Sequence, residues 1–180
     1  MTRATLILLA TMLLGTLLAA AATSDIHARR VSNRLNLSVL AAGVVFALIL
    51  HGWRAGSWQV FTGVGLGLAV WFPMFAFRLM GAGDVKLLAA CGAWLGWQGM
   101  LTATLATGVY GGVLGAVWLL RSQGAVSAMH TVATAVRAPW LMKMRPYDAR
   151  ERLPYAVAIA GGVVTAWWFQ HGNVLTGARV

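Results

Sequence analysis

The sequence predicts an all-α, polytopic membrane protein with about six transmembrane helices, for three reasons. Of the 180 residues, 59% are hydrophobic and only 10% are charged, and a water-soluble domain could not cover that much apolar surface. The apolar residues gather into six segments, most of them close to the length that crosses a bilayer. Basic residues collect between alternate segments. We therefore expect a single membrane domain over residues 1–180.

Six apolar segments are the expected spans, at residues 4–22, 36–53, 57–80, 84–98, 99–120 and 154–171. The first also resembles a cleavable signal peptide, because Met1-Thr2-Arg3 precedes an apolar run that ends in four alanines. Cleavage would leave the arginines after this run on the translocated side, so we interpret the segment as a helix. The fourth segment is short for a hydrocarbon layer of about 30 Å, so it must be tilted or shielded.

Glycines recur in the third and fifth expected spans, a spacing typical of helices that approach closely in lipid. These glycines are Gly63, Gly65, Gly67, Gly108, Gly111, Gly112 and Gly115. Close packing is the simpler interpretation, and a ligand site is the alternative.

The distribution of basic residues predicts the orientation. With six spans and an outer N-terminus, eleven of the fourteen basic residues lie inside, as the positive-inside rule requires. The three outer ones are Arg3, Arg54 and Arg179. If segment 84–98 did not span, the asymmetry would largely vanish.

Residues 121–153 form the longest polar connection, expected as a basic cytoplasmic loop that contacts anionic lipid. Its middle, 125–141, fits either a helix in the headgroup plane or an irregular loop. The formal net charge of +10 is spread between apolar segments, so the lipid bilayer is the expected partner and nucleic acid is not. The single cysteine, Cys91, and four dispersed histidines predict no metal site, and no cofactor is expected.

Two isolated acids, Asp25 and Asp84, close the first span and open the fourth, and the six-span arrangement puts both at the inner face. Asp84 could simply cap a helix and Asp25 could pair with Arg29. Two carboxylates close together in a poorly solvated site, however, share one proton. Such a pair can activate water and protonate a leaving amine, as in aspartyl hydrolysis. Gly81 and Gly83, just before Asp84, would let a substrate strand approach and would accommodate an unusual turn.

Three segments resemble the type IV prepilin peptidases, a family of GxGD intramembrane aspartyl proteases. Gly81-Ala82-Gly83-Asp84 matches the GxGD signature. Asp25 followed by Arg29-Arg30-Val31-Ser32-Asn33-Arg34-Leu35 is similar to the family's D…R-x-I-P-N-x-L segment. The stretch from Leu153-Pro154-Tyr155 to Gly161-Gly162 resembles its final conserved segment. The size resembles the short TadV/CpaA-like form that serves Flp-pilus (tight adherence) systems, without the cysteine-rich insertion of members that also N-methylate the pilin.

The resemblance implies an inner-membrane aspartyl endopeptidase that removes the leader of a membrane-inserted prepilin at the cytoplasmic face. It makes Asp25 and Asp84 the catalytic pair. Supporting or substrate-binding roles fall to Gly81, Gly83, Lys86, Arg29, Asn33 and Pro154. Ser32 departs from the usual proline and gives up a rigid turn. Two alternatives are a GxGD protease for another leader-bearing substrate and a non-enzymatic membrane protein, either a small transporter or a pilus-assembly scaffold.

Overall fold

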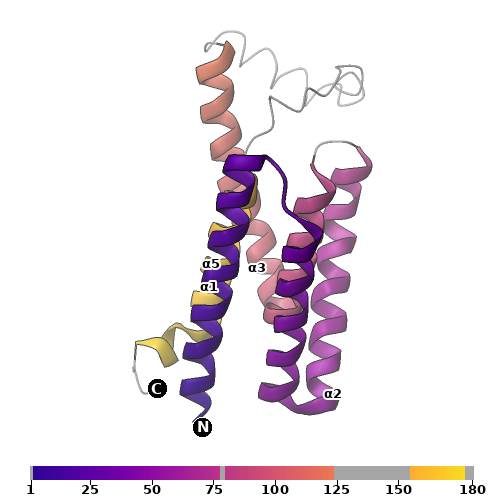
Figure 1. The fold of residues 1–180 in the computed structure, drawn as a ribbon, viewed down its shortest axis with the longest axis vertical. Helices are drawn as coiled ribbons and strands as arrows, with labels where there is room; N and C mark the ends of the chain where they lie inside the picture. Colours follow the sequence, from indigo (N-terminus) through magenta and orange to yellow (C-terminus); the bar gives the residue numbers. More distant parts are fainter. Residues whose placement is uncertain (1, 78–79, 124–154, 177–180) are drawn as a thin grey trace.

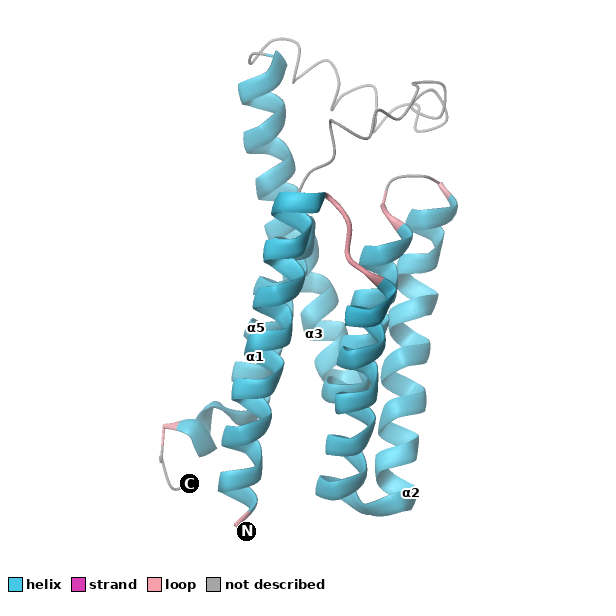
Figure 2. Cartoon of the chain, in the orientation of Figure 1, coloured by secondary structure: helices cyan, strands magenta, loops and turns pink. Residues whose placement is uncertain are grey.

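The computed structural model describes residues 2–77, 80–123 and 155–176, and these form four helices with no strand among them (Figure 1). The helices are α1 (Arg3–Ala28), α2 (Asn33–Ala76), α3 (Ala82–Gln123) and α5 (Tyr155–Leu175). Figure 2 shows that helix makes up nearly all of the described chain. The predicted all-α class is confirmed. Residues 121–123 continue α3, and the rest of the expected basic loop, from 124 to 153, lies outside the described residues, as does Pro154.

Two of these helices are interrupted at a glycine. A straight helix as long as α2 would measure about 66 Å, roughly twice the hydrocarbon thickness. At Gly52, however, the backbone takes φ 76° and ψ 175°, which is not helical. The two halves of α2 run side by side and join at the bottom of the view in Figure 1. α3 is interrupted in the same way at Gly96, where φ is 64° and ψ is −175°. Positive φ is a conformation that glycine adopts without strain.

Three helices are long and apolar enough to cross a membrane, namely α1, α2 and the part of α3 from Ala82 to Trp118. Interruptions inside α2 and α3 correspond to the expected junctions between the second and third and between the fourth and fifth spans. α5 covers the expected sixth segment, yet it is not among the three. The chain is therefore a polytopic membrane protein, and the number of six spans stays a prediction.

Glycines bring α2 and α3 into backbone contact. A methyl group on Gly63 would overlap the carbonyl oxygen of Gly92, and one on Gly92 would overlap that of Gly63. A methyl group on Gly67 would lie 3.0 Å from the Cα atom of Ala89. Packing is thus the role of these two glycines of the third expected span. Gly65, between them, has nothing within 4 Å of such a methyl group.

An aromatic cluster joins α2, α3 and α5 in the core. The ring of Trp94 lies 5.4 Å from that of Phe46 and 6.1 Å from that of Trp167, measured between centroids. Trp94 is buried, and its indole N–H donates to the carbonyl of Val39 at 2.8 Å. Outside the core, large apolar side chains such as Phe61, which is 72% exposed, point outward. Lipid is the solvent that makes such exposure favourable.

One end of the bundle collects several helix termini. α1 ends there at Ala28, and α2, α3 and α5 each begin there (Figure 1). The opposite end holds the start of α1, the end of α5 and the interruption of α2 at Gly52. The end where these helices begin and α1 finishes, called below the carboxylate end, carries both isolated acids.

Candidate functional site

Asp25 lies in the last turn of α1 and is 6% exposed. Its carboxylate oxygen Oδ2 accepts a hydrogen bond from the backbone N–H of Ala156 at 3.0 Å. Ala156 is in the first turn of α5, where backbone N–H groups lack partners within the helix. The positive end of the helix dipole also faces a carboxylate in this position. Residues 131 positions apart in the sequence thus meet at one buried contact.

Asp84 lies in the first turn of α3 and is half-buried. Its backbone N–H donates to the carbonyl of Gly81 at 3.1 Å. Asp25 therefore contacts the first turn of α5, and Asp84 lies in the first turn of α3, which begins at the same end of the bundle.

The two glycines before Asp84 leave room for different groups. A Cβ atom on Gly81 would lie 3.0 Å from the Asp84 oxygen Oδ2, and one on Gly83 would lie 3.2 Å from the carbonyl oxygen of Val31. Neither glycine has a positive φ; among the described residues the glycines that do are Gly52 and Gly96. The expectation of an unusual turn at these two glycines is therefore wrong if such a turn means a positive φ. A side chain at either position would crowd atoms of the protein itself, so close approach favours glycine at both.

The connection between α1 and α2 packs against this glycine segment. The side-chain amide Nδ2 of Asn36 donates to the Gly83 carbonyl at 3.0 Å. Lys86 Nζ donates to Asn33 Oδ1 at 3.1 Å, at the exposed rim. Two of the expected supporting residues, Asn33 and Lys86, are thus brought together. The sequence did not single out Asn36, because an asparagine at the start of an apolar segment matches no motif. Only its burial in the folded structure distinguishes it.

Arg29 and Ser32 define the ends of the helices on either side of this connection. Arg29 is exposed and adopts a left-handed conformation with φ 51°, and its backbone N–H donates to the Asp25 carbonyl at 2.8 Å. The Asp25 carboxylate accepts from Ala156, and the contact between Asp25 and Arg29 is this backbone hydrogen bond, not the charge pair of the alternative interpretation. Ser32 is the N-cap of α2, with φ −69°, and its hydroxyl accepts from the Leu35 N–H at 3.2 Å. The serine keeps the φ that proline would impose and adds a cap.

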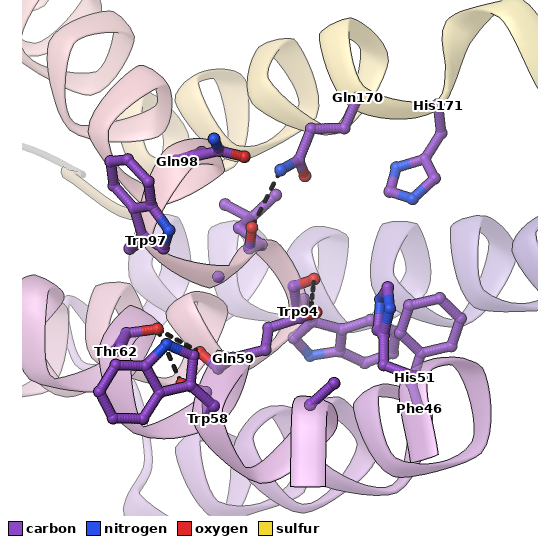
Figure 3. A pocket seen from close by; sticks show the side chains of 13 residues that line it. Phe46, His51, Trp58, Gln59, Thr62, Trp94, Trp97, Gln98, Gln170 and His171 are labelled. Atoms are coloured by element: carbon purple, nitrogen blue, oxygen red, sulfur yellow. Dashed lines mark hydrogen bonds between the residues drawn. The ribbon is translucent and has the colours of Figure 1, made fainter.

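A cavity of about 380 Å³ lies toward the opposite end of the bundle (Figure 3). It adjoins the interruption of α3, where Gln59 donates to the Trp94 carbonyl at 3.1 Å and Gln170 to the Leu95 carbonyl at 3.0 Å. These carbonyls would otherwise be unpaired at the C-terminal end of a helical segment. Neither carboxylate lines the cavity. Its glutamines stabilise the short segment 82–95, and the candidate site remains at the carboxylate end.

Comparison with known proteins points to one family. A family model described as the type IV leader peptidase family matches residues 12–116, a range that contains both carboxylates and ends before α5. The prepilin leader peptidase/N-methyltransferase of Aeromonas salmonicida (strain A449) is 35% identical over 113 residues, which are 59% of this chain and 38% of the relative. The protein of the same name from Stutzerimonas stutzeri is 47% identical over 66 residues, 33% of this chain and 22% of the relative.

The similarity covers only part of each relative. In both, the matched part is well under two thirds of the relative's length. No solved structure matches the chain. Because the family model matches more than half of the residues, including Asp25 and Asp84, the chain belongs to the type IV leader peptidase family.

Proposed function

We propose that the protein is a membrane aspartyl endopeptidase that removes the leader peptide of type IV or Flp-type prepilins, with Asp25 and Asp84 as its catalytic pair. One observation carries this proposal. Carboxylates from α1 and α3 lie at the same end of the bundle, one hydrogen-bonded to Ala156 in the first turn of α5 and the other in the first turn of α3. A pair of acids at the edge of an apolar bundle is costly to retain without a function.

The proposed reaction uses one ionised and one protonated carboxyl group. We assign the ionised role to Asp25, because the Ala156 N–H and the start of α5 stabilise negative charge there. Asp25 takes a proton from water while the water oxygen attacks the scissile carbonyl carbon. Asp84 donates a hydrogen bond to the carbonyl oxygen. When the tetrahedral intermediate collapses, the C–N bond breaks and the proton that Asp25 took from water passes to the leaving amine, which leaves Asp25 ionised again.

The substrate class is inferred from the relatives, whose names describe prepilin leader peptidases. The proposed orientation toward the cytoplasm follows from the eleven basic residues expected on the inner side. Under that rule the carboxylate end faces the cytoplasm of a bacterial inner membrane. Specificity for Flp-type pilins is the finer part of the proposal, supported by the absence of a cysteine-rich insertion between the first two expected spans.

The other expected residues take supporting roles in this proposal. Gly81 makes room for the Asp84 carboxylate, and Gly83 lets the α1–α2 connection pack closely. Lys86 and Asn33 tie that connection to α3. The exposed Arg29 follows α1 four residues after Asp25, and in this proposal it contacts the leader. Pro154 immediately precedes the turn of α5 that meets Asp25.

The test is leader removal in cells that co-express this protein with a candidate prepilin. Asp25→Asn and Asp84→Asn should each abolish cleavage, since an amide can neither activate water nor donate a proton as an acid does. Asp148→Asn is the matched control, because it makes the same chemical change at an acid outside the proposed pair. It should cleave like wild type.

Accumulation of each variant in the membrane fraction is measured alongside cleavage. A variant that accumulates normally but does not cleave supports the catalytic assignment. Wild-type cleavage by either Asp25→Asn or Asp84→Asn would refute the paired-carboxylate mechanism. If the wild-type protein leaves every prepilin and every other leader-bearing substrate intact, the non-enzymatic alternative is favoured.

A further inference from the structure

Asn36 is a buried polar residue that lies beside the glycine segment. It is 5% exposed and sits in the first turn of α2, where its own backbone N–H donates to the Ser32 carbonyl at 3.1 Å. Its side-chain amide Nδ2 donates to the carbonyl oxygen of Gly83 at 3.0 Å. That carbonyl belongs to the peptide unit that joins Gly83 to Asp84. The Asn36 side chain therefore binds the peptide unit whose nitrogen belongs to Asp84.

We propose that Asn36 is a positioning residue, which fixes the Gly83–Asp84 peptide unit and thereby the direction of the Asp84 carboxylate. This inference rests on the proposed catalytic role of Asp84. Asn36 would act through the backbone without touching the substrate.

The second amide atom of Asn36 argues against a purely structural role. Its Oδ1 is buried and has no hydrogen-bond partner among the described residues. An unpaired buried acceptor is unfavourable, so an apolar side chain of similar size would be the better choice for packing alone. Rotating the amide by half a turn would not help, because Oδ1 would then face the Gly83 carbonyl oxygen, another acceptor. The amide is therefore oriented with its Nδ2 donor toward the Gly83 carbonyl, and this orientation leaves Oδ1 without a partner among the described residues.

The other side-chain contacts to this segment from outside α3 are exposed or less directional than that of Asn36. The hydrogen bond from Lys86 to Asn33 is exposed, and exposed contacts of long charged side chains contribute little. Val31 meets Gly83 through van der Waals contact, which limits distance but not the tilt of the peptide unit. The Asp84 N–H also donates to the Gly81 carbonyl, but that hydrogen bond lies within the segment itself. Asn36 makes the buried hydrogen bond that ties this peptide unit to α2.

Asn36→Leu removes the donor while keeping a similar side-chain volume. A displacement of about 1 Å in a reacting group can lower a rate about 100-fold. We expect the kcat of the purified protein, assayed in nanodiscs with a synthetic prepilin leader peptide, to fall between about 10-fold and 100-fold. KM should stay within about threefold, because Asn36 does not contact the peptide. Asn36→Thr, which keeps a hydroxyl donor, should recover part of the lost kcat.

Thr11→Val is the matched control. It removes a side-chain hydrogen bond between helices, from the Trp167 indole to Thr11 at 2.9 Å, at a distance from the carboxylates along α1. It should lower the thermal unfolding midpoint but leave kcat unchanged, which separates a loss of stability from a loss of catalysis. Equal kcat for Asn36→Leu and wild type would overturn the inference, and so would a loss of activity that merely follows the folded fraction.

A second variant covers the case in which leucine does not fit. Asn36→Ala also lacks the donor and cannot overpack the site, so it should show the same fall in kcat. Wild-type kcat in Asn36→Ala would overturn the inference. The two proposals fail separately: if Asp84→Asn cleaves normally, the catalytic pair is wrong, whereas an inactive Asp84→Asn beside a fully active Asn36→Ala refutes only the role of Asn36.

Discussion

The Asp25 carboxylate has two separable tasks, one chemical and one structural. It would activate water in the proposed reaction, and it also accepts the Ala156 N–H that begins α5. Asparagine retains a side-chain oxygen at the same place, so it preserves the second task alone. Leucine removes both.

We expect Asp25→Asn to unfold at the wild-type temperature while failing to cleave. Asp25→Leu should be less stable by about 1–3 kcal/mol, because the buried Ala156 N–H is left without an acceptor. Thermal unfolding of the purified protein in detergent, followed by tryptophan fluorescence, measures the difference. Equal unfolding midpoints for the two variants would mean that the contact at α5 contributes nothing to stability.

At the scale of helices, the crossing of α2 and α3 depends on which glycines face each other. Gly63→Ala would drive a methyl group into the Gly92 carbonyl, and overpacking of this kind costs about 1–3 kcal/mol. Gly65→Ala, two residues along the same helix, meets nothing within 4 Å. We expect Gly63→Ala to lower the unfolding midpoint clearly and Gly65→Ala to leave it unchanged or raise it. Destabilisation by Gly65→Ala of the same size would show that helix flexibility, rather than this contact, matters.

The helix ends show what hydropathy can and cannot locate. Junctions expected near residues 53–57 and 98–99 occur at Gly52 and Gly96. α1 continues past the expected end at residue 22 to Ala28, so the polar residues Ser24, Asp25 and His27 are helical. Hydropathy marks where apolar character stops, whereas a helix ends where its backbone conformation changes. A glycine within an apolar run gives no sign of whether it will adopt a positive φ.

At the scale of the whole molecule, the proposed orientation places the carboxylate end in the cytoplasm and Gly52 at the opposite face. Cysteine labelling in cells can test this, because the native Cys91 is fully buried and should not react in the folded protein. Ala28→Cys is exposed at the carboxylate end, and Trp53→Cys replaces a side chain that is 77% exposed at the other.

A membrane-impermeant maleimide should label Trp53→Cys in intact spheroplasts and Ala28→Cys only after permeabilisation. The wild-type protein serves as the unlabelled control. The reverse pattern would place the carboxylates outside and contradict the positive-inside argument. Labelling of both variants in intact spheroplasts would show that the two ends do not lie on opposite sides of the membrane.

Residue composition and patterning alone were enough to establish an all-α membrane protein with two isolated acids at helix ends. The free energy of burying an apolar segment in lipid is the sum of local contributions from its residues, so hydropathy along the sequence predicts the membrane helices directly. Tertiary structure alone decided that Asp25 meets Ala156 and that Asn36, not Asn33, is buried against Gly83. It also selected Gly63 over Gly65 for the helix crossing. These contacts depend on how helices from distant parts of the chain rotate and cross, which is determined by their mutual packing.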